Sequence, residues 1–362
     1  MGTRPSSCAS VPKIPVQGQL HGYPIETTVD DERAKYYLEN YLAGKREHPT
    51  FHQHLDALHH QLGERLPTRQ ELKEIAKQMS VDVAALIFGH QLLKQPGNPA
   101  LQRQFLDHLN KIHAGKAQFP KSDVLILIVP GFDYVQNGHL TGADFARPRH
   151  LLNQAGYETY FIPLDPLGSV EANAEVITDA ILNHPHRNLV IVGASSAGPA
   201  IHLSLGKLLR PSDLDQMKAW LNLGGILQGT PVVDHFSSGL KRLVFSLIVW
   251  AKDWNMRSFE SMSTAISRRR FATLRVPEHI AIFNYLGLSL SGDISNFARD
   301  KYLLMRKKGP NDGLSLLPDL VAPNSQSILA PRSDHFFAED PEIDDKTLAL
   351  LLTIITRISP SQ

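Results

Sequence analysis

Two adjacent serines, Ser195 and Ser196, stand at the centre of the stretch "NLVIVGASSAGPAI", between a short apolar run and a segment typical of a helix. A strand that runs directly into a helix needs a sharp turn, and small residues on both sides of the serine pair let the two backbones approach. Such a turn lifts a side chain above the sheet and directs the first N–H groups of the helix toward it. A serine hydroxyl there is placed for acyl transfer, because these N–H groups can stabilise a developing oxyanion.

Either serine could occupy the tip of this turn. With Ser195 at the centre the pattern is Gly-x-Ser-x-Ala, and with Ser196 it is Ala-x-Ser-x-Gly. We favour Ser195 because it keeps the Val-Gly entry of common nucleophile turns, with Ser196 as the alternative. A dinucleotide-binding turn would instead need a G-x-G-x-x-G run in the first strand unit and an acid about 20 residues further on, and the sequence has neither.

A serine hydroxyl is a weak nucleophile and needs a base that is itself oriented by an acid. Two downstream stretches, "GPNDGLSLLPD" and "SILAPRSDHFFAED", offer Asp312 in a glycine-flanked loop and His335 after an apolar run. We interpret them as acid and base. Asp319 and Asp234 are alternative acids, and Asp334 is expected to cap or salt-bridge the loop of the histidine.

The apolar run "LILIVPGF" suggests where the second oxyanion donor lies. Gly131 lets the backbone turn after this run, so that the N–H of Phe132 can face the serine. Together with the N–H of Ser196, it would form the donor pair that an acyl-transfer transition state requires. The alternative is an ordinary loop between a strand and a helix.

The elements that must position these residues fall into two parts. Residues 1–118 are predicted to form an all-helical extension, with Thr68 and Glu71 as a capping box and Ser80 as a second cap. In residues 119–362 short apolar runs alternate with helical segments, which favours a mostly parallel sheet covered by helices on both faces. The predicted strands are Val124–Val129, Thr159–Ile162, Leu189–Val192, Ala219–Leu223, Ile280–Tyr285 and Ser327–Leu329.

Residues 120–360 resemble the α/β-hydrolase superfamily, and within it the bacterial serine esterases and lipases. There the acid sits in an "NDGLV"-type loop and the histidine follows the last strand as "DHF" or "DHL". The resemblance implies the α/β-hydrolase fold and assigns Ser195 as nucleophile, Asp312 as acid and His335 as base. This chain departs from the pattern at Ala197, where glycine is usual, and at residues 315–316, where Ser-Leu replaces a common Val-Pro pair.

The sequence therefore predicts a serine-dependent hydrolase of carboxylic esters that acts through an acyl-enzyme and needs no cofactor or metal. A lid-like insertion is expected at about 235–278, and its apolar part, Leu243 to Trp254, favours small-molecule or lipid-like apolar esters. An amidase or acyltransferase with the same residues is one alternative. A non-catalytic hydrolase-like binding protein is the other.

The amino-acid composition limits the classes of binding partner that we expect. Lys plus Arg number 37 against 36 Asp plus Glu, a formal charge of +1, so no nucleic-acid partner is expected. The basic run "SRRRFATLR" is interpreted as a solvated helix face. The longest apolar stretch is far shorter than the ~20 residues that a transmembrane helix needs. His52, His54, His59 and His60 cluster without a metal-ligand pattern and also favour a solvated helix.

Cys8 is the only cysteine, so an intrachain disulfide is excluded. The stretch "CASVPK" that it begins resembles the start of a mature bacterial lipoprotein, whereas the residues before it contain no apolar signal sequence. The sequence does not decide between the cytoplasm and the bacterial cell envelope.

Overall fold

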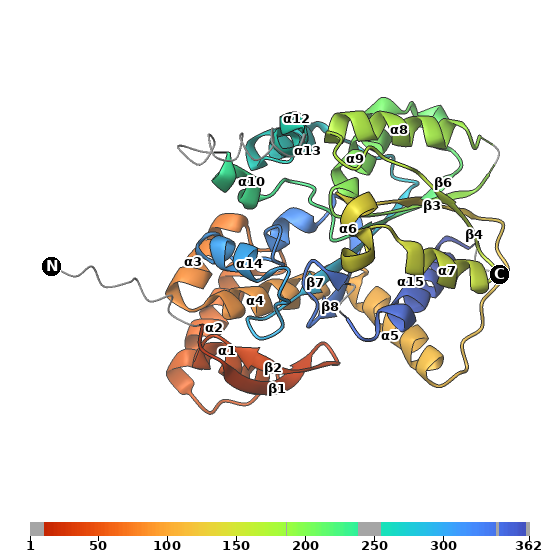
Figure 1. Ribbon diagram of the computed structural model, residues 1–362. Coiled ribbons are helices and arrows are strands. Elements are labelled where there is room, and N and C mark those ends of the chain that lie inside the picture. The colour runs from red at the N-terminus through yellow and green to blue at the C-terminus, as the bar shows by residue number, and fades with distance from the viewer. Residues whose placement is uncertain (1–10, 186, 238–254, 338–339, 360–362) are drawn as a thin grey trace.

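A six-stranded sheet forms the centre of the protein (Figure 1). The computed structural model describes residues 11–185, 187–237, 255–337 and 340–359. All neighbouring strands are parallel, in the order β4-β3-β5-β6-β7-β8. The strands are β3 (Leu125–Val129), β4 (Glu158–Phe161), β5 (Leu189–Ala194), β6 (Met217–Leu223), β7 (Ala281–Leu288) and β8 (Ser325–Pro331).

Each of the six predicted apolar runs forms a strand. The apolar character of β3 and β5 reflects burial on both faces of the sheet, because helices cover a parallel sheet from both sides, whereas the edge strand β4 is partly exposed. All five residues of β3 are buried. The prediction of the fold class is confirmed for this part of the chain.

Two groups of helices cover the sheet. On one face lie α8 (Val170–Leu182) and α9 (Ala197–Leu203). On the other lie α5 (Asn98–His113), α7 (Ala146–Gln154) and α15 (Ile343–Ile358). Shorter helices and turns connect these layers: α6 (Tyr134–Thr141), η2 (Ser204–Leu208), η3 (Pro211–Leu214), α14 (Arg299–Met305), η4 (Arg306–Lys308) and η5 (Leu317–Leu320).

The N-terminal extension is not all helical, which corrects the sequence prediction. It begins with an antiparallel hairpin of β1 (Ile14–Leu20) and β2 (Tyr23–Val29). His21 and Gly22 form its two-residue turn, and both have positive φ, as the turn of a tight hairpin requires. The prolines and the glycine within these strands weaken the strand signal in the sequence. The helical part is α1 (Glu32–Tyr36), η1 (Tyr37–Tyr41), α2 (Pro49–Leu62), α3 (Arg69–Gln78) and α4 (Val81–Lys94), followed by α5, which covers the sheet.

Both predicted helix starts in the extension are confirmed. Thr68 and Glu71 form the reciprocal capping box of α3, and the Ser80 hydroxyl accepts from the N–H of Val83 at the start of α4. Helix α4 packs against the end of the sheet, and a Cβ atom at Gly89 would lie 2.7 Å from Leu288 Cδ2. The extension and the sheet therefore share one apolar core.

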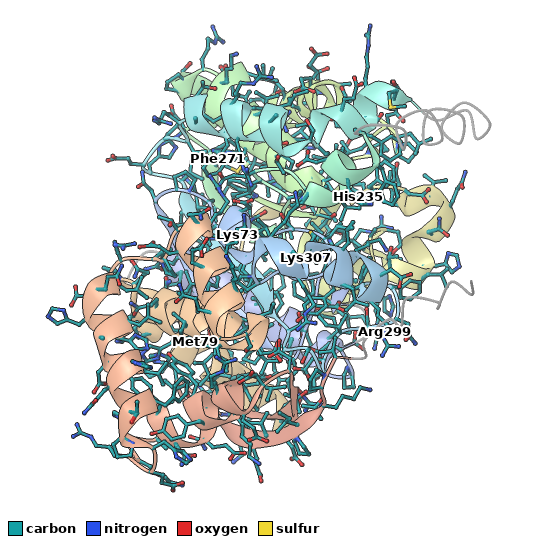
Figure 2. The ribbon with its side chains drawn as sticks, turned by 90° about the vertical axis from the view of Figure 1, so that its left-hand side faces the viewer. Lys73, Met79, His235, Phe271, Arg299 and Lys307 are labelled. Atoms are coloured by element: carbon teal, nitrogen blue, oxygen red, sulfur yellow. The ribbon has the colours of Figure 1, made fainter. Side chains whose placement is uncertain are left out.

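The insertion predicted as lid-like, at about 235–278, is described only at its two ends. Helix α10 (Pro231–Phe236) leads into it, and α12 (Met256–Ser261) and α13 (Thr264–Thr273) lie at its other end. The predicted lid stretch Leu243–Trp254 lies outside the described residues, as does Cys8. Figure 2 looks onto the side that carries labelled residues of the extension (Lys73, Met79), of α14 and η4 (Arg299, Lys307) and of the predicted insertion (His235, Phe271), with the insertion at the top and Lys73 beside Lys307 in the middle. Within the described part of the chain, every helix is too short or too polar to cross a membrane.

Candidate active site

Ser195 occupies a tight turn between the end of β5 and the start of α9. Its φ is +55°, a left-handed conformation that is unfavourable for a residue with a side chain. The turn is held by three backbone bonds: Ser195 N–H donates to Leu223 O at 3.1 Å, and Ser195 O accepts from Gly198 and Ile226 N–H at 3.1 and 3.0 Å. The surrounding backbone thus fixes the strained residue.

Close packing around this turn explains the small residues in the motif. A Cβ atom at Gly193 would lie 2.4 Å from Ile201 Cδ1 and 3.1 Å from Ala197 Cβ. Ala197 is fully buried. The methyl group of Ala197 therefore fits because Gly193 has no side chain. A Cβ atom at Gly198 would lie 2.7 Å from Gly225 Cα. The position after Ala197 is therefore the one where a second backbone segment leaves no room for a side chain.

The structure brings Ser195, rather than Ser196, to the candidate histidine. Ser195 Oγ lies 3.0 Å from His335 Nε2, and His335 Nδ1 lies 2.8 Å from Asp312 Oδ2. A carboxylate only accepts hydrogen bonds, so this arrangement puts the ring proton on Nδ1 and leaves Nε2 to accept from the hydroxyl. Ser196 has a right-handed helical conformation with φ of −64° and precedes the first residue of α9.

The Asp312 carboxylate is buried, and both of its oxygens have hydrogen-bond partners. Its Oδ1 accepts from the N–H groups of Leu314 at 2.9 Å and Ser315 at 2.7 Å, and its Oδ2 faces His335. The backbone also joins the two loops, because the N–H of His335 donates to Asp312 O at 2.8 Å. Serine at 315 suits this loop, since its hydroxyl donates to Gly229 O at 2.9 Å while its N–H holds the carboxylate.

The loop after β3 lies beside Ser195. A Cβ atom at Gly131 would be 3.7 Å from Ser195 Cβ and 3.3 Å from Ala143 Cβ. Gly131 N–H donates to Ala143 O at 3.0 Å, and the N–H two residues later, at Asp133, donates to Pro166 O at 3.1 Å. The loop is thus held on both sides of Phe132. Among the described residues, the N–H groups of Phe132 and Ser196 donate to no protein acceptor.

The alternative acids have other partners. Asp319 is fully buried, with Arg69 Nη1 at 2.5 Å and Arg268 Nη2 at 3.0 Å. Because Arg268 pairs with this buried carboxylate, the interpretation of its basic run as a solvated face is wrong there. Asp234 accepts from the N–H and the hydroxyl of Thr264 at 2.9 and 2.7 Å and so holds the start of α13.

Asp334 holds the backbone on either side of its own loop. Its Oδ1 accepts from Phe336 N–H and its Oδ2 from Ser295 N–H, both at 2.8 Å. The expectation that it caps the histidine loop fits these contacts.

Aromatic rings flank the candidate site. Phe132 packs edge to face against Phe259 of α12, with ring centroids 5.6 Å apart. The Phe336 ring lies 5.5 Å from that of His335 and 5.8 Å from that of Phe297. The loop after β3, whose Gly131 lies beside Ser195, and the loop of His335 therefore each carry a packed aromatic ring.

Of the four histidines of α2, His52 and His59 are packed against tyrosines, whereas His54 and His60 are exposed, as expected for a solvated helix face. His52 is buried with Nδ1 3.1 Å from the Tyr36 hydroxyl, and His59 Nε2 lies 3.0 Å from the Tyr37 hydroxyl. Burial lowers the pKa of His59 to about 4. Within the described ranges, no group of three or more His, Cys, Asp or Glu side chains is arranged to hold a metal ion.

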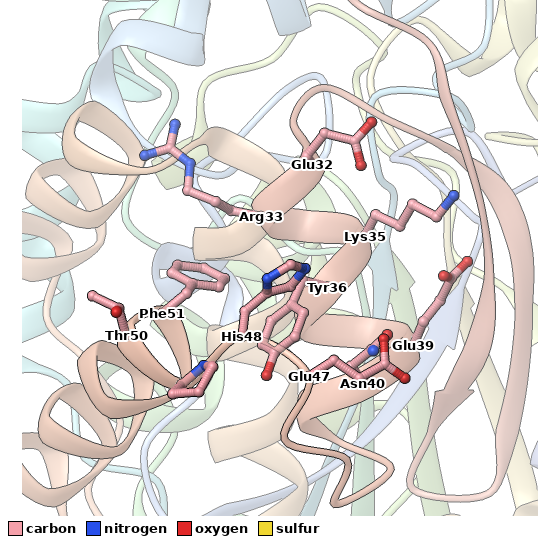
Figure 3. A pocket seen from close by; sticks show the side chains of 11 residues that line it. Glu32, Arg33, Lys35, Tyr36, Glu39, Asn40, Glu47, His48, Thr50 and Phe51 are labelled. Carbon is pink, nitrogen blue, oxygen red and sulfur yellow. The ribbon is translucent and has the colours of Figure 1, made fainter.

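One open pocket of about 540 Å³ lies on the extension, far along the chain from the candidate site. It is formed by α1, η1 and the start of α2, and the rings of Tyr36 and Phe51 line it together with charged side chains of both signs (Figure 3). It shares no residue with the hydrogen-bonded chain of Ser195, His335 and Asp312.

The sequence matches no family model and no curated protein. The fold is similar to that of a metagenomic carboxyl esterase, with 18% identity over 66% of this chain and 76% of the esterase and a TM-score of 0.53. It is also similar to a lipase of Bacillus licheniformis in its mature form, with 16% identity over 67% of this chain and 95% of the lipase and a TM-score of 0.50. The parallel sheet, its two helical layers and these similarities define an α/β-hydrolase fold.

Proposed function

We propose that this protein is a serine hydrolase that cleaves carboxylic esters, with Ser195 as nucleophile, His335 as general base and acid, and Asp312 as the acid that orients the histidine. The observation that carries the proposal is the continuous chain of hydrogen bonds from Ser195 Oγ through both ring nitrogens of His335 to Asp312. A non-catalytic fold has no need for a strained serine in contact with a base that is itself paired with a buried carboxylate.

The reaction follows from these contacts. Ser195 Oγ attacks the ester carbonyl as His335 Nε2 accepts its proton, and the N–H groups of Phe132 and Ser196 donate to the oxyanion. His335 then gives the proton to the departing alkoxide, which leaves as an alcohol. Water attacks the acyl-enzyme in the same way, with His335 again as base, and frees the carboxylic acid and the serine.

Apolar esters are the proposed substrates. The rings of Phe132, Phe259 and Phe336 border the site and offer apolar surface to an acyl chain or an alcohol. The two similar structures are described as a carboxyl esterase and a lipase, which agrees with this choice of substrate.

Fluorophosphonate labelling with mass-spectrometric mapping, together with turnover of p-nitrophenyl esters, tests the proposal. We expect label and turnover in the wild type and in Ser196→Ala, and neither in Ser195→Ala. Label on Ser196 in the wild type would identify Ser196, and not Ser195, as the nucleophile. An unlabelled wild type would contradict the proposal and favour a hydrolase-like binding protein. Labelling with turnover of amides alone would identify an amidase, and acyl transfer to an added alcohol alone would identify a transferase.

A further inference from the structure

A short segment after β7 lies between the N-terminal extension and the loop that carries His335. We name residues 289–295 the bridging segment and residues 332–337 the histidine loop. The bridging segment is bonded to the extension on one side and to the histidine loop on the other, so the two distant parts of the chain are connected through it.

The first connection to the extension is Asp82, in the first turn of α4. Its carboxylate has no exposed surface. It accepts from the N–H of Ser291 at 2.9 Å and from its hydroxyl at 2.6 Å, and also from the N–H of Asp30 at 2.8 Å. A buried carboxylate that receives several hydrogen bonds fixes its donors, because a donor that leaves would stay unpaired in the protein interior.

The second connection comes from β2 of the hairpin. The Thr27 hydroxyl donates to Asp293 Oδ1 at 2.6 Å, and Gly292 N–H donates to Thr28 O at 3.0 Å. A Cβ atom at Gly292 would lie 2.3 Å from Thr28 Oγ1, so the segment lies directly against the strand. The hairpin therefore fixes the middle of the bridging segment.

On its other side the bridging segment holds the histidine loop. Ser295 N–H donates to Asp334 Oδ2, and Asp293 Oδ1 lies 3.5 Å from Arg332 Nε. Asp334 and Phe336 are the immediate neighbours of His335, and Asp334 Oδ1 accepts from Phe336 N–H. A displacement of the bridging segment therefore acts on both residues that flank the histidine.

The histidine loop is packed on one side and partly open on the side of the bridging segment. Ser333 and Asp334 are buried, and a Cβ atom at Gly287 of β7 would lie 2.5 Å from Ser333 O, so the loop lies directly against the sheet. On its other side a pocket of about 580 Å³ is lined by Ser333, Asp334 and Phe336 as well as residues 292–295. Because part of this space is open, the directed hydrogen bonds to the bridging segment add to the packing that holds the loop.

We infer that Thr27 and Asp82 are positioning residues for His335, acting through the bridging segment, and that the extension is in this way a functional part of the catalytic unit. The inference rests on the proposed function, in which His335 Nε2 must stay within hydrogen-bond reach of Ser195 Oγ. A misplacement of about 1 Å in a catalytic group can slow a reaction by about 100-fold, so loosening the loop lowers turnover without removing any group that contacts substrate.

The test compares Thr27→Val, Thr27→Ser and Ser291→Ala in the full-length protein. Valine keeps the shape of threonine but cannot donate to Asp293, whereas serine restores the hydroxyl. We expect Thr27→Val and Ser291→Ala to lower kcat for a p-nitrophenyl ester by about tenfold with KM unchanged. Fluorophosphonate labelling of Ser195 should slow by a similar factor, and Thr27→Ser should retain wild-type values.

Arg69→Gln is the matched control. Arg69 Nη1 pairs with Asp319 Oδ1 at 2.5 Å and so ties α3 of the extension to η5 through a contact that involves neither the bridging segment nor Asp82. It should lower Tm but leave kcat within about twofold of wild type, as expected for a loss of stability alone. Equal kcat values in Thr27→Val and wild type, or an equal loss in Arg69→Gln, would overturn the inference.

A second readout separates this inference from the proposed function. The proton that His335 Nδ1 shares with Asp312 gives a downfield signal in proton NMR, and we expect it to broaden or shift in Thr27→Val but not in Thr27→Ser. A wild type without labelling contradicts the hydrolase proposal alone. A wild type that labels, with unchanged labelling and NMR signal in Thr27→Val, contradicts the positioning role alone.

Discussion

Ser195 Oγ and His335 Nε2 lie 3.0 Å apart although 140 positions separate the two residues in the sequence. Ser195 follows β5 and His335 follows β8, and β6 and β7 lie between these strands in the sheet. The histidine loop must therefore reach across the ends of two strands. The backbone bond from His335 N–H to Asp312 O and the contacts of Asp334 hold it in that position.

The Asp312 carboxylate should act by fixing the tautomer of the histidine. In Asp312→Asn the side-chain oxygen can still accept from the N–H groups of Leu314 and Ser315, which turns the amide nitrogen toward His335. The ring would then carry its proton on Nε2 and could not accept from Ser195. We expect kcat to fall by about 10⁴-fold with little change in Tm. Asp319→Asn, which removes a different buried carboxylate, should not produce this loss if Asp312 is the acid.

The left-handed conformation of Ser195 should be measurable as stored strain. Glycine adopts positive φ without penalty, whereas alanine retains the strain, so Ser195→Gly should be more stable than Ser195→Ala by about 1 kcal/mol in the free energy of unfolding. Urea denaturation of the two variants checks the difference.

The neighbouring serine provides the control for this measurement. Ser196 has a right-handed helical φ, where glycine gains nothing and loses more entropy on folding. The order should therefore be reversed, with Ser196→Ala more stable than Ser196→Gly. The same order at both positions would show that Ser195 is not strained in solution.

Local sequence patterns were sufficient for the sheet and for several helix ends. A buried parallel strand is apolar on both faces, so runs such as "LILIV" identify it without knowledge of its neighbours. The capping box of Thr68 and Glu71 is equally local, since both partners lie within one turn. The motif around Ser195 and the loops of Asp312 and His335 could be singled out in the same way, and the structure brings these three side chains into contact.

Contacts between distant segments could not be predicted. The hairpin at residues 14–29 contains prolines and a glycine, and its stability depends on packing against η1 and the rest of the extension. The partners of Asp319 lie 250 and 51 positions away in the sequence, so its charge carries no signal of its role. The same applies to Asp82 and Ser291, which are 209 positions apart.

The Asp319 carboxylate should stabilise the contact between α3 of the extension and α13. It is fully buried between Arg69 of α3 and Arg268 of α13. Asp319→Asn keeps the shape but leaves both guanidinium groups without a charged partner. We expect the free energy of unfolding to fall by about 2 kcal/mol, less than for a completely buried pair because both arginines keep some contact with water. Glu158→Gln, at the solvent-exposed pair with Arg187, should leave the free energy of unfolding unchanged, and equal effects would contradict the role of Asp319.

Acid should destabilise the extension through two histidines that pack against each other, His59 and His90. Burial, with a smaller effect of the Lys94 charge, lowers the pKa of His59 to about 4 and that of His90 to about 3. In the unfolded chain both titrate near pH 6.5. Their contribution to stability is therefore complete above pH 6.5 and declines as the pH falls toward 4, because the unfolded chain takes up protons first.

Urea unfolding measured between pH 7.5 and 5 tests this predicted loss of stability at low pH. His90→Gln cannot take up a proton, so its free energy of unfolding should fall less steeply with decreasing pH than that of the wild type, whatever its value at pH 7.5. His54→Gln, at an exposed position of the same helix as His59, should keep the wild-type slope. Parallel slopes for wild type and His90→Gln would mean that His90 is protonated to the same extent in the folded and unfolded protein, which its burial against His59 and His21 argues against.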